Sequence, residues 1–337
     1  MRRQLAIFFI FLLPLFPAFA QRHFVAMTYN VENLFDTKHD SLKDDYEFLP
    51  DAVRHWSRSR YWKKLSNISR VIVSACERQI PDVVCLCEVE NDSCLFDLTR
   101  RSSLRALDYR YFVTNSADHR GIDVALLYQR GTFRPILSQS ITPNLSLPVR
   151  DILYVSGRLV SGDTLDIFCV HMPSKIGGKQ STDNRSRVAS LLRSKIDSVC
   201  RCRAVPSILV MGDFNDNPRS ASVYEALGAK EVDSNSSDGC LVNLMIDKKG
   251  GINRHVCGTY RYRGSWETLD HVIVNGAMTS RKRGLRVGDG GASIVNLDFL
   301  LEDDSRYGGV RPFRTYLGAR YHGGYSDHLP VVVDLLE

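Results

Sequence analysis

The chain has 337 residues and a formal net charge of +6, and 44% of its residues are hydrophobic while 24% are charged. A disordered chain would contain fewer apolar residues and a more one-sided charge, so the composition excludes that class. Nine cysteines are too few for a disulfide-rich scaffold, and a chain of this length can bury a core without such links.

The N-terminal segment has the pattern of a secretory signal peptide. Arg2 and Arg3 precede an uncharged run from Leu5 to Ala20 that ends in Ala-Phe-Ala. The run is shorter than a membrane span requires, and two prolines interrupt it. We therefore predict a signal peptide over residues 1–20 and a periplasmic or secreted protein. After cleavage we expect a net charge of +4, because the two arginines are lost, and no stable membrane association.

Export would permit disulfides, but an odd number of cysteines leaves at least one thiol unpaired within the chain. Cys85, Cys87 and Cys169 lie in apolar runs and are expected to be small buried hydrophobes. The pairs Cys200/Cys202 and Cys240/Cys257 are expected in loops, and their spacing does not determine which cysteines form disulfides.

Seven short apolar runs predict buried strands, with helical patterns between them. Residues 61–78 and 185–200 carry apolar side chains at a period of 3.6, which predicts amphipathic helices. Strands that alternate with helices predict an α/β fold. The polar, turn-rich segments 36–55 and 281–325 are expected to be long loops. The predicted strands are Phe24–Tyr29, Asp82–Cys87, Val124–Tyr128, Asp166–Val170, Ser207–Met211, His271–Val274 and Pro330–Leu335.

Polar residues with catalytic potential adjoin five of these strands. They follow four of the strands directly, and they precede the last one. In α/β sheets, ligands bind near strand ends, where loops converge, so we expect these side chains to meet. In chain order they are Asn30, Glu32, Glu88, His171, Asp213, Asn215, Asp327 and His328.

The residue types of this set predict its chemistry. The carboxylates of Glu88, Asp213 and Asp327, with the amide oxygen of Asn30 or Asn215, are hard ligands that suit Mg²⁺, Mn²⁺ or Ca²⁺ rather than zinc.

Two histidines, His171 and His328, are available for proton transfer or for phosphate binding. Asp270 can orient His328 by accepting from its ring N–H. A cation, an oriented histidine and a water nucleophile together form an arrangement that hydrolyses phosphoesters.

Other motifs do not fit the sequence. The segment that starts at Asp213 begins like an EF-hand loop, but Pro218 occupies the position of the obligatory glycine and Tyr224 that of the glutamate. The sequence contains no G-x-S-x-G nucleophile elbow, no P-loop and no G-x-G-x-x-G phosphate loop.

Taken together, the motifs resemble those of the endonuclease/exonuclease/phosphatase superfamily, which includes the pancreatic-type deoxyribonucleases. They occur in the family's order over residues 24–337, and the segment Gly309–Leu329 is similar to a secreted bacterial subgroup. The matching segments are Thr28-Tyr-Asn-Val-Glu-Asn33, Cys87-Glu88, Gly121-Ile-Asp-Val-Ala125, Val170-His-Met-Pro-Ser174, Met211-Gly-Asp-Phe-Asn215, Leu269-Asp-His271 and Tyr325-Ser-Asp-His-Leu329.

The resemblance implies a four-layer α/β sandwich, in which two central mixed sheets pack face to face between helices. It therefore implies a single catalytic domain over residues 21–337. By the same resemblance, Glu88 is the principal metal ligand with Asn30 beside it, and Asp327 contributes to the metal site. Asp213 and Asn215 are expected to hold the attacking water, the phosphate or a second cation.

The resemblance also implies the proton-transfer groups. His328, paired with Asp270, would accept a proton from water. His171 would bind the phosphate or protonate the leaving oxygen, and Asp123 would be its acidic partner.

The substrate is less well determined by the sequence. The family cuts DNA, RNA, phosphoinositides, nucleotides and sphingomyelin, and a charge of +4 is only mildly favourable for nucleic acid. An acidic segment over residues 36–51 argues against nucleic acid as the substrate, because it would repel a polyanion. Clusters of basic and aromatic residues favour it, although Lys63 and Lys64 are expected on a solvated helix face. These clusters are Arg58–Lys64, Arg281–Arg283 with Arg286, and Arg311, Arg314 and Arg320 with Tyr316 and Tyr321.

Three hypotheses remain open. The protein is expected to be a monomeric exported nuclease or phosphodiesterase, a phosphatase or phosphodiesterase for a small phosphorylated metabolite or lipid headgroup, or a non-catalytic binding protein. The last is the weakest, because every chemical residue of the motif set is present.

Overall fold

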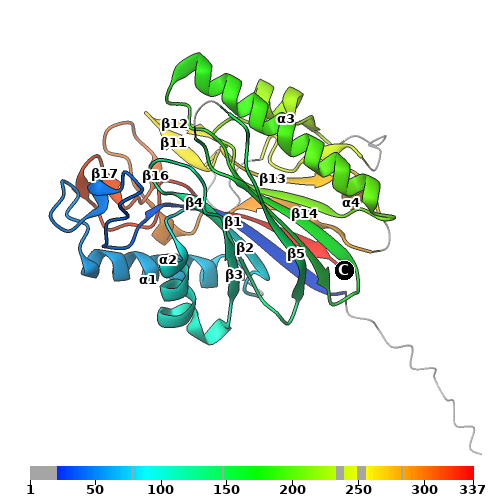
Figure 1. Ribbon diagram of the computed structural model, residues 1–337, viewed down its shortest axis with the longest axis horizontal. Coiled ribbons are helices and arrows are strands. Elements are labelled where there is room, and N and C mark those ends of the chain that lie inside the picture. Colours follow the sequence, from blue (N-terminus) through cyan, green and yellow to red (C-terminus); the bar gives the residue numbers. More distant parts are fainter. Residues whose placement is uncertain (1–20, 78, 146–147, 233–238, 249–255, 282–283) are drawn as a thin grey trace, which may run out of the picture.

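Two mixed β-sheets pack face to face in the computed structural model, and helices cover their outer faces (Figure 1). The structure describes residues 21–77, 79–145, 148–232, 239–248, 256–281 and 284–337. The expected α/β sandwich is confirmed. The expected signal peptide over residues 1–20 lies outside the described residues, as do Lys282 and Arg283 of one predicted basic cluster.

The first sheet has six strands and contains both ends of the described chain. Its central strands β1 and β2 are parallel, and β19 pairs with β1 in the antiparallel sense. In spatial order the strands are β14 (Arg286–Ile294), β19 (Val331–Leu336), β1 (His23–Leu34), β2 (Val83–Val89), β4 (Asp123–Tyr128) and β3 (Arg110–Val113).

The second sheet has seven strands, and its centre carries most of the predicted polar motifs. Strands β7 and β8 are parallel, and β13 pairs with β8 in the antiparallel sense. In spatial order the strands are β5 (Phe133–Ile141), β6 (Ile152–Leu159), β7 (Thr164–His171), β8 (Ile208–Asp213), β13 (Asp270–Asn275), β10 (Leu241–Asn243) and β9 (Ala229–Lys230).

Apolar side chains from both sheets form the core between them. Small thiols lie at this contact: Cys87 Sγ donates to Val170 O at 3.3 Å, and Cys85 Sγ donates to Met211 O at 3.6 Å. Cys85, Cys87 and Cys169 are fully buried free thiols, as expected. Their small size allows the backbones of the two sheets to approach closely.

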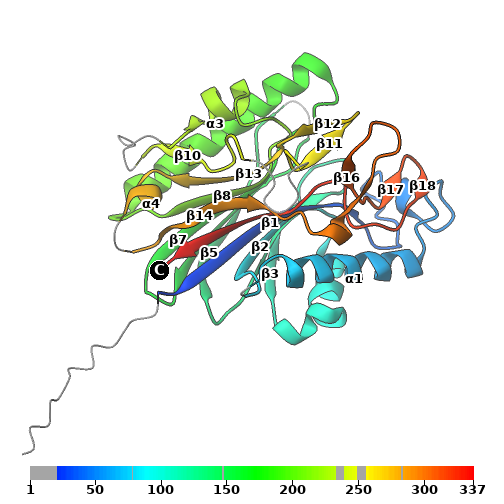
Figure 2. The same ribbon diagram turned by 180° about the vertical axis from the view of Figure 1, so that it is seen from behind.

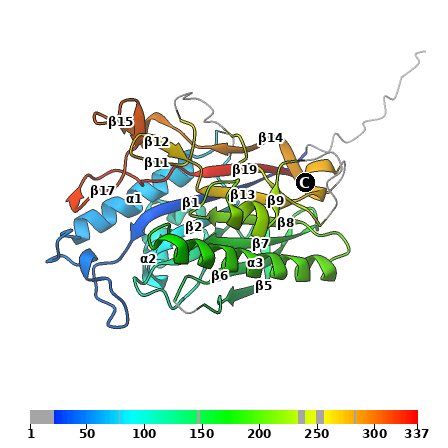
Figure 3. The same cartoon turned by 90° about the horizontal axis from the view of Figure 1, so that it is seen from above.

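The two long helices cover opposite outer faces of the sandwich (Figures 1 and 3). Both begin before the predicted residues; α1 starts at Arg58 because Ser57 caps the Arg60 N–H. Cys200 and Cys202 lie in α3, not in a loop as expected. The helices are α1 (Arg58–Ser74), α2 (Asp92–Phe96), α3 (Gly178–Cys202) and α4 (Ala277–Ser280), with 3₁₀ turns at Tyr46–Phe48, Ser103–Leu107 and Asp298–Leu300 and π turns at Asp97–Arg101 and Ala221–Ala226.

Residues 281–325 are not one long loop. They contain β14, which pairs with β19 but carries three glycines and few β-branched residues, so its sequence hides the strand. They also contain two short hairpins, which lie near a third hairpin at the end of the sandwich far from the C-terminus (Figure 2). The hairpins are β11 (Tyr260–Tyr262) with β12 (Ser265–Glu267), β15 (Leu301–Asp303) with β16 (Val310–Pro312), and β17 (Tyr316–Leu317) with β18 (Arg320–Tyr321).

Within the described part of the chain, no helix has the length and apolar character needed to cross a bilayer.

Helix α1 offers a matched test of its buried face. Val71 is fully buried against the first sheet, whereas Val73, two residues along, is 46% exposed. We expect Val71→Ala to lower the free energy of unfolding by about 2 kcal/mol, and Val73→Ala to change it by less than about 0.5 kcal/mol. Urea denaturation of both variants measures the difference, and equal values would show that α1 is not packed as described.

Candidate active site

The register of the second sheet places three predicted residues in one row. His171 is the partner of Asp213 across β7 and β8, and Asp270 is the partner of Asp213 across β8 and β13. On the first sheet, Asn30 is the partner of Cys87, so Asn30 and Glu88 lie at neighbouring strand ends. The two sheets therefore present their polar residues at the same end of the sandwich.

Gly212 permits the close approach that aligns this row. Its φ is +144°, and a Cβ atom at this position would lie 1.9 Å from the Val170 carbonyl oxygen. The clash would be with backbone, which cannot swing aside. The glycine before Asp213 is therefore required by the packing of β8 against β7.

Three residues of the predicted polar set, among them Glu32 with φ +53°, occupy left-handed backbone conformations. Glu88 has φ +68° and Asn215 has φ +51°. Asparagine tolerates this region, but glutamate rarely adopts it, and such strain is found where function fixes a side chain. The Asn33 N–H holds the Glu88 carboxylate by donating to Oε2 at 2.9 Å.

Asp213 joins the two sheets. Its Oδ2 accepts from Asn30 Nδ2 at 2.9 Å, and its Oδ1 accepts from the Asn215 N–H at 2.8 Å. Burial raises the pKa of Asp213 to about 7, and the negative charge of Asp270 adds to this rise, while His328 and the hydrogen bonds oppose it. Asp213 can therefore exchange a proton near neutral pH.

His328 and Asp270 form a buried pair. His328 Nδ1 lies 2.7 Å from Asp270 Oδ2, and its Nε2 lies 3.9 Å from Asp213 Oδ2. Tyr260 packs against the imidazole ring at a centroid distance of 4.9 Å. Burial disfavours charge on His328, but Asp270 and Asp213 outweigh it and raise its pKa well above the usual value. The pair leaves Nε2 as the ring atom that faces the cavity.

His171 has the opposite charge preference. Its Nε2 lies 3.6 Å from Asp213 Oδ2 and 3.9 Å from Glu88 Oε1. Burial, followed by the positive charge of Arg150, lowers its pKa well below the usual value, so the ring is neutral. The two histidines therefore differ in protonation, which is a common basis for dividing acid and base roles.

The structure does not bring Asp123 to His171. Asp123 Oδ1 accepts from Thr114 Oγ1 at 2.6 Å and from the Ser116 N–H at 3.0 Å, so its carboxylate anchors the chain after β3. His171 Nδ1 is buried and has no hydrogen-bond partner among the described residues. The expected pairing is therefore wrong in this structure, because Asp123 is committed to a local turn.

Asp327 lies at the cavity but is bound by an arginine. Its Oδ2 accepts from Arg314 Nη2 at 2.8 Å. Burial alone would raise the pKa of Asp327, but Arg314 and His328 outweigh it and hold this pKa below its usual value. Asp327 is therefore ionised, as a cation ligand must be.

A buried ionic network behind Asp327 was not predicted. Glu32 Oε2 accepts from the Thr315 N–H at 2.6 Å, and Arg314 Nε lies 3.4 Å from Glu32 Oε1. Lys64 is 1% exposed and donates to the Tyr325 carbonyl at 2.7 Å, so its expected place on a solvated face is wrong. Burial lowers the pKa of Lys64 to about 8. In the sequence, the only indication of this buried network was the position of Lys64 among the apolar residues of α1.

The predicted residues surround a cavity of about 530 Å³. Asn30 and Asp270 lie behind this lining and hold the residues that reach it. Of the predicted set, the lining includes Glu88, His171, Asp213, Asn215, Asp327 and His328.

The donor atoms fit a hard divalent cation. Glu88, Asp213 and Asp327 offer carboxylate oxygens to the cavity, and Glu88 Oε1 has no closer polar contact than His171 at 3.9 Å among the described residues. Asp213, Asp270 and His328 form a second possible group, with ligand atoms within 4.8 Å of one another. Because Asp270 and His328 already bond each other, we regard this second group as suited to proton transfer.

Comparison with known proteins places the fold and motifs in a family. The family model described as Endonuclease/Exonuclease/phosphatase family matches residues 25–337. The chain belongs to this family, whose members are phosphoester hydrolases. No curated protein sequence matches the chain.

Solved structures share the fold at low sequence identity. An endonuclease/exonuclease/phosphatase family protein from Bacteroides thetaiotaomicron is 16% identical, with a TM-score of 0.61, and 94% of this chain covers 98% of that one. A mannosyl-6-phosphatase from the same organism is 17% identical, with a TM-score of 0.57 and coverage of 93% and 99%. D. rerio TDP2 complexed with a single-strand DNA product is 16% identical, with a TM-score of 0.55 and coverage of 93% and 98%.

The pair of His328 and Asp270 can be tested directly. Because the Asp270 charge helps to raise the pKa of His328, we expect Asp270→Asn to lower that pKa. NMR titration of the histidine ring protons in protein treated with a chelator measures this shift.

An exposed pair is the control for this titration. His23 Nδ1 lies 2.7 Å from Asp334 Oδ2 at the other end of β1, and the Asp270→Asn change is expected to leave the ring-proton NMR signals of His23 where they are in the parent protein. An unchanged His328 titration would contradict the described pairing.

Proposed function

We propose that the protein is an exported, divalent-cation-dependent phosphodiesterase that cleaves nucleic acid with a water molecule activated by His328. The observation that carries the proposal is the buried row of His171, Asp213 and Asp270. His328, which Asp270 holds through Nδ1, lines the same cavity as His171 and Asp213. The family's hydrolytic chemistry requires such an arrangement of a base and of groups that receive negative charge.

In the proposed mechanism, Glu88 would hold a Mg²⁺, Mn²⁺ or Ca²⁺ ion, with Asp327 beside it and Asn30 behind the cavity lining. When bound, the cation supplies positive charge to a phosphoryl oxygen and to the leaving oxygen. The Glu88 carboxylate is already oriented by the Asn33 N–H, so it needs no rearrangement to receive the ion.

Proton transfer is assigned to His328. A cation bound beside Asp213 would lower the raised pKa of His328 and favour loss of its Nε2 proton. Nε2 would then accept a proton from the attacking water, and Asp270 would stabilise the imidazolium through Nδ1. Asp213 and Asn215 hold the water and the phosphate. His171, which is neutral, donates from Nε2 to a phosphoryl oxygen or to the leaving group.

Nucleic acid is proposed as the substrate for two reasons. The TDP2 relative binds a single-strand DNA product, and arginines line the surface beside the active site. The acidic segment 36–51 repels nucleic acid less than its composition indicates. Within it, Asp45 is buried and accepts from His39 Nδ1 and from the Asp40 N–H. A phosphatase for a small phosphorylated sugar is the second candidate, because the mannosyl-6-phosphatase shares the fold equally well.

Export is proposed from the sequence of residues 1–20 and from the similarity to a secreted bacterial subgroup. N-terminal sequencing of the protein from its native source would find a new terminus near residue 21 if the segment is removed.

Removal of the proposed base is the first test of the mechanism. We expect His328→Ala to lower the rate of phosphoester hydrolysis by about 10²- to 10⁴-fold, because the water loses its proton acceptor. His23→Ala, which removes a histidine from an exposed His–Asp pair, is expected to keep the parent rate. A His328→Ala protein with the parent rate at the same cation concentration would overturn the assignment.

A substrate panel separates the two candidate activities. The purified protein is incubated with single-stranded DNA, RNA, plasmid DNA and sugar monophosphates, each with Mg²⁺, Mn²⁺, Ca²⁺ or chelator. We expect cleavage of nucleic acid that the chelator abolishes. Release of phosphate from the monoesters with intact nucleic acid would favour the phosphatase, and no hydrolysis with any cation would favour a binding protein.

A further inference from the structure

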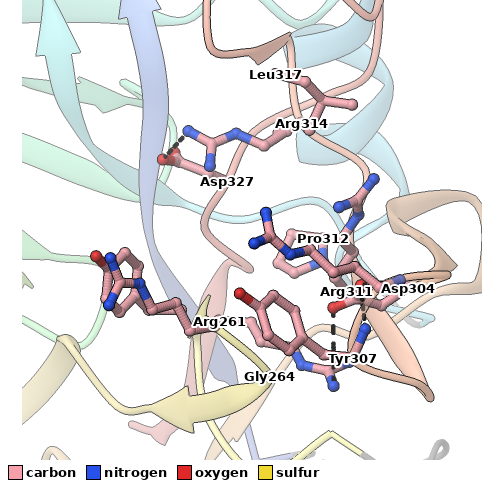
Figure 4. Close-up of a pocket in the computed structure, with 12 residues that line it drawn as sticks. Arg261, Gly264, Asp304, Tyr307, Arg311, Pro312, Arg314, Leu317 and Asp327 are labelled. Carbon is pink, nitrogen blue, oxygen red and sulfur yellow. Dashed lines mark hydrogen bonds and ion pairs between the residues drawn. The ribbon is translucent and has the colours of Figure 1, made fainter.

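A second cavity, of about 570 Å³, adjoins the active site and is rich in arginine. It shares Asp327 and Tyr262 with the catalytic cavity, so the two form neighbouring hollows on one surface. Figure 4 shows Arg261 and Arg311 beside this cavity and Arg314 reaching to Asp327. Its five arginines are Arg261, Arg263, Arg306, Arg311 and Arg314.

The walls of this cavity are held together by hydrogen bonds and close packing. Arg261 on β11 donates to the carbonyls of Gly308, at 2.6 Å, and Val310, which ties the β11–β12 hairpin to the loop between β15 and β16. Asp304 Oδ1 accepts from two N–H groups of that loop. A Cβ atom on Gly264 would lie 2.9 Å from Tyr307 Cβ, so the hairpin and the loop are in direct contact. The cavity therefore has a defined shape.

Three of the arginines are engaged by carboxylates. Arg311 Nε lies 2.8 Å from Glu302, Arg314 binds Asp327 and Glu32, and Arg261 lies 3.8 Å from Asp304. These three help to build the site and leave little free charge.

The other two arginines are available to a ligand. Arg263 and Arg306 are exposed, and neither has a carboxylate within ion-pair distance in the part of the chain that the structure describes. Each guanidinium lies over a tyrosine ring, Arg263 at 5.1 Å from Tyr262 and Arg306 at 5.2 Å from Tyr307. Uncompensated guanidinium groups at a cavity bind phosphate oxygens, often through two parallel hydrogen bonds.

The hairpin connects this cavity to the chemistry. Tyr260 packs on His328 in the catalytic cavity, while Tyr262, two residues later on β11, borders both cavities. Tyr262 is 52% exposed and offers a face on which a base can stack. A substrate whose scissile phosphate lies beside His328 would therefore pass Tyr262 before it reaches Arg263.

We infer that the second cavity binds another phosphate of the substrate, next to the one that is cleaved. This inference rests on the proposed hydrolytic function and deepens it, because it predicts a substrate with at least two phosphates. An oligonucleotide supplies them in series along its backbone, and a bisphosphorylated sugar supplies them within one small molecule.

The test compares substrates with one and two phosphates in the double variant Arg263→Gln/Arg306→Gln. The one-phosphate substrate is the p-nitrophenyl ester of thymidine 5′-phosphate. The two-phosphate substrates are a 5′-phosphorylated thymidine dinucleotide and a sugar bisphosphate. We expect the KM for the dinucleotide to rise about 10- to 100-fold, because two charge-assisted contacts are lost, with kcat/KM for the one-phosphate ester unchanged within about two-fold.

A matched variant controls for net charge. Arg134 and Arg158 are exposed partners on β5 and β6, at the edge of the second sheet, and the double change Arg134→Gln/Arg158→Gln removes the same charge. It is expected to leave KM for every substrate unchanged. Equal effects of the two double variants, or an equal change for one- and two-phosphate substrates, would overturn the inference. An effect confined to the sugar bisphosphate would support the second phosphate site but identify a small molecule as its source.

A binding measurement separates this inference from the proposed function. Fluorescence anisotropy with a labelled oligothymidylate, in chelator, requires no hydrolysis. We expect weaker binding by the Arg263→Gln/Arg306→Gln protein and a shallower dependence of affinity on salt, because fewer phosphates are neutralised. Arginine-dependent binding without hydrolysis under any condition would reject the proposed function and leave the phosphate site standing. Binding that does not depend on the two arginines would reject the site.

Discussion

The active site depends on one buried hydrogen bond between the two sheets. Asn30 on β1 donates to Asp213 on β8, so a strand of each sheet contributes to the same contact. Both side chains are almost fully buried, and a buried carboxylate without this donor would carry a large desolvation cost. The contact therefore fixes how the polar end of one sheet faces the polar end of the other, while the apolar core beneath it holds the sheets together.

Around this contact, the fold concentrates negative charge and then balances it. Burial, with the negative charge of Asp270, raises the pKa of Asp213 to about 7. At His328 burial acts in the opposite direction, but the carboxylates of Asp270 and Asp213 outweigh it and raise the pKa of the ring. Lys64 and Arg314 supply positive charge behind Asp327, outside the row of catalytic residues. A divalent cation and a phosphate together would bring charges of both signs into this field. The site is therefore suited to bind the ion and its anionic substrate together.

Much of this arrangement could be predicted from the sequence, because apolar runs that end in polar motifs mark both the strands and the site. Seven predicted strands are present, and their motif residues lie at one end of the sandwich, where Asp123 does not pair with His171. Predictions from local sequence patterns were wrong where contacts outside the pattern determine the structure. Asp123 binds a nearby turn, Lys64 is buried by residues far along the chain, and β14 is held by pairing with β19 despite its glycines.

The origin of the catalytic row in three adjacent strands has a consequence for folding. Side chains alternate between the faces of a strand, so a slip of one residue in β8 would turn Asp213 to the opposite face of the sheet. Such a molecule could keep its strands and much of its compactness, yet Asp213 would no longer lie in a row with His171 and Asp270. Recovered activity after refolding would therefore count the molecules with correct strand register, a quantity that measurements of secondary structure do not resolve.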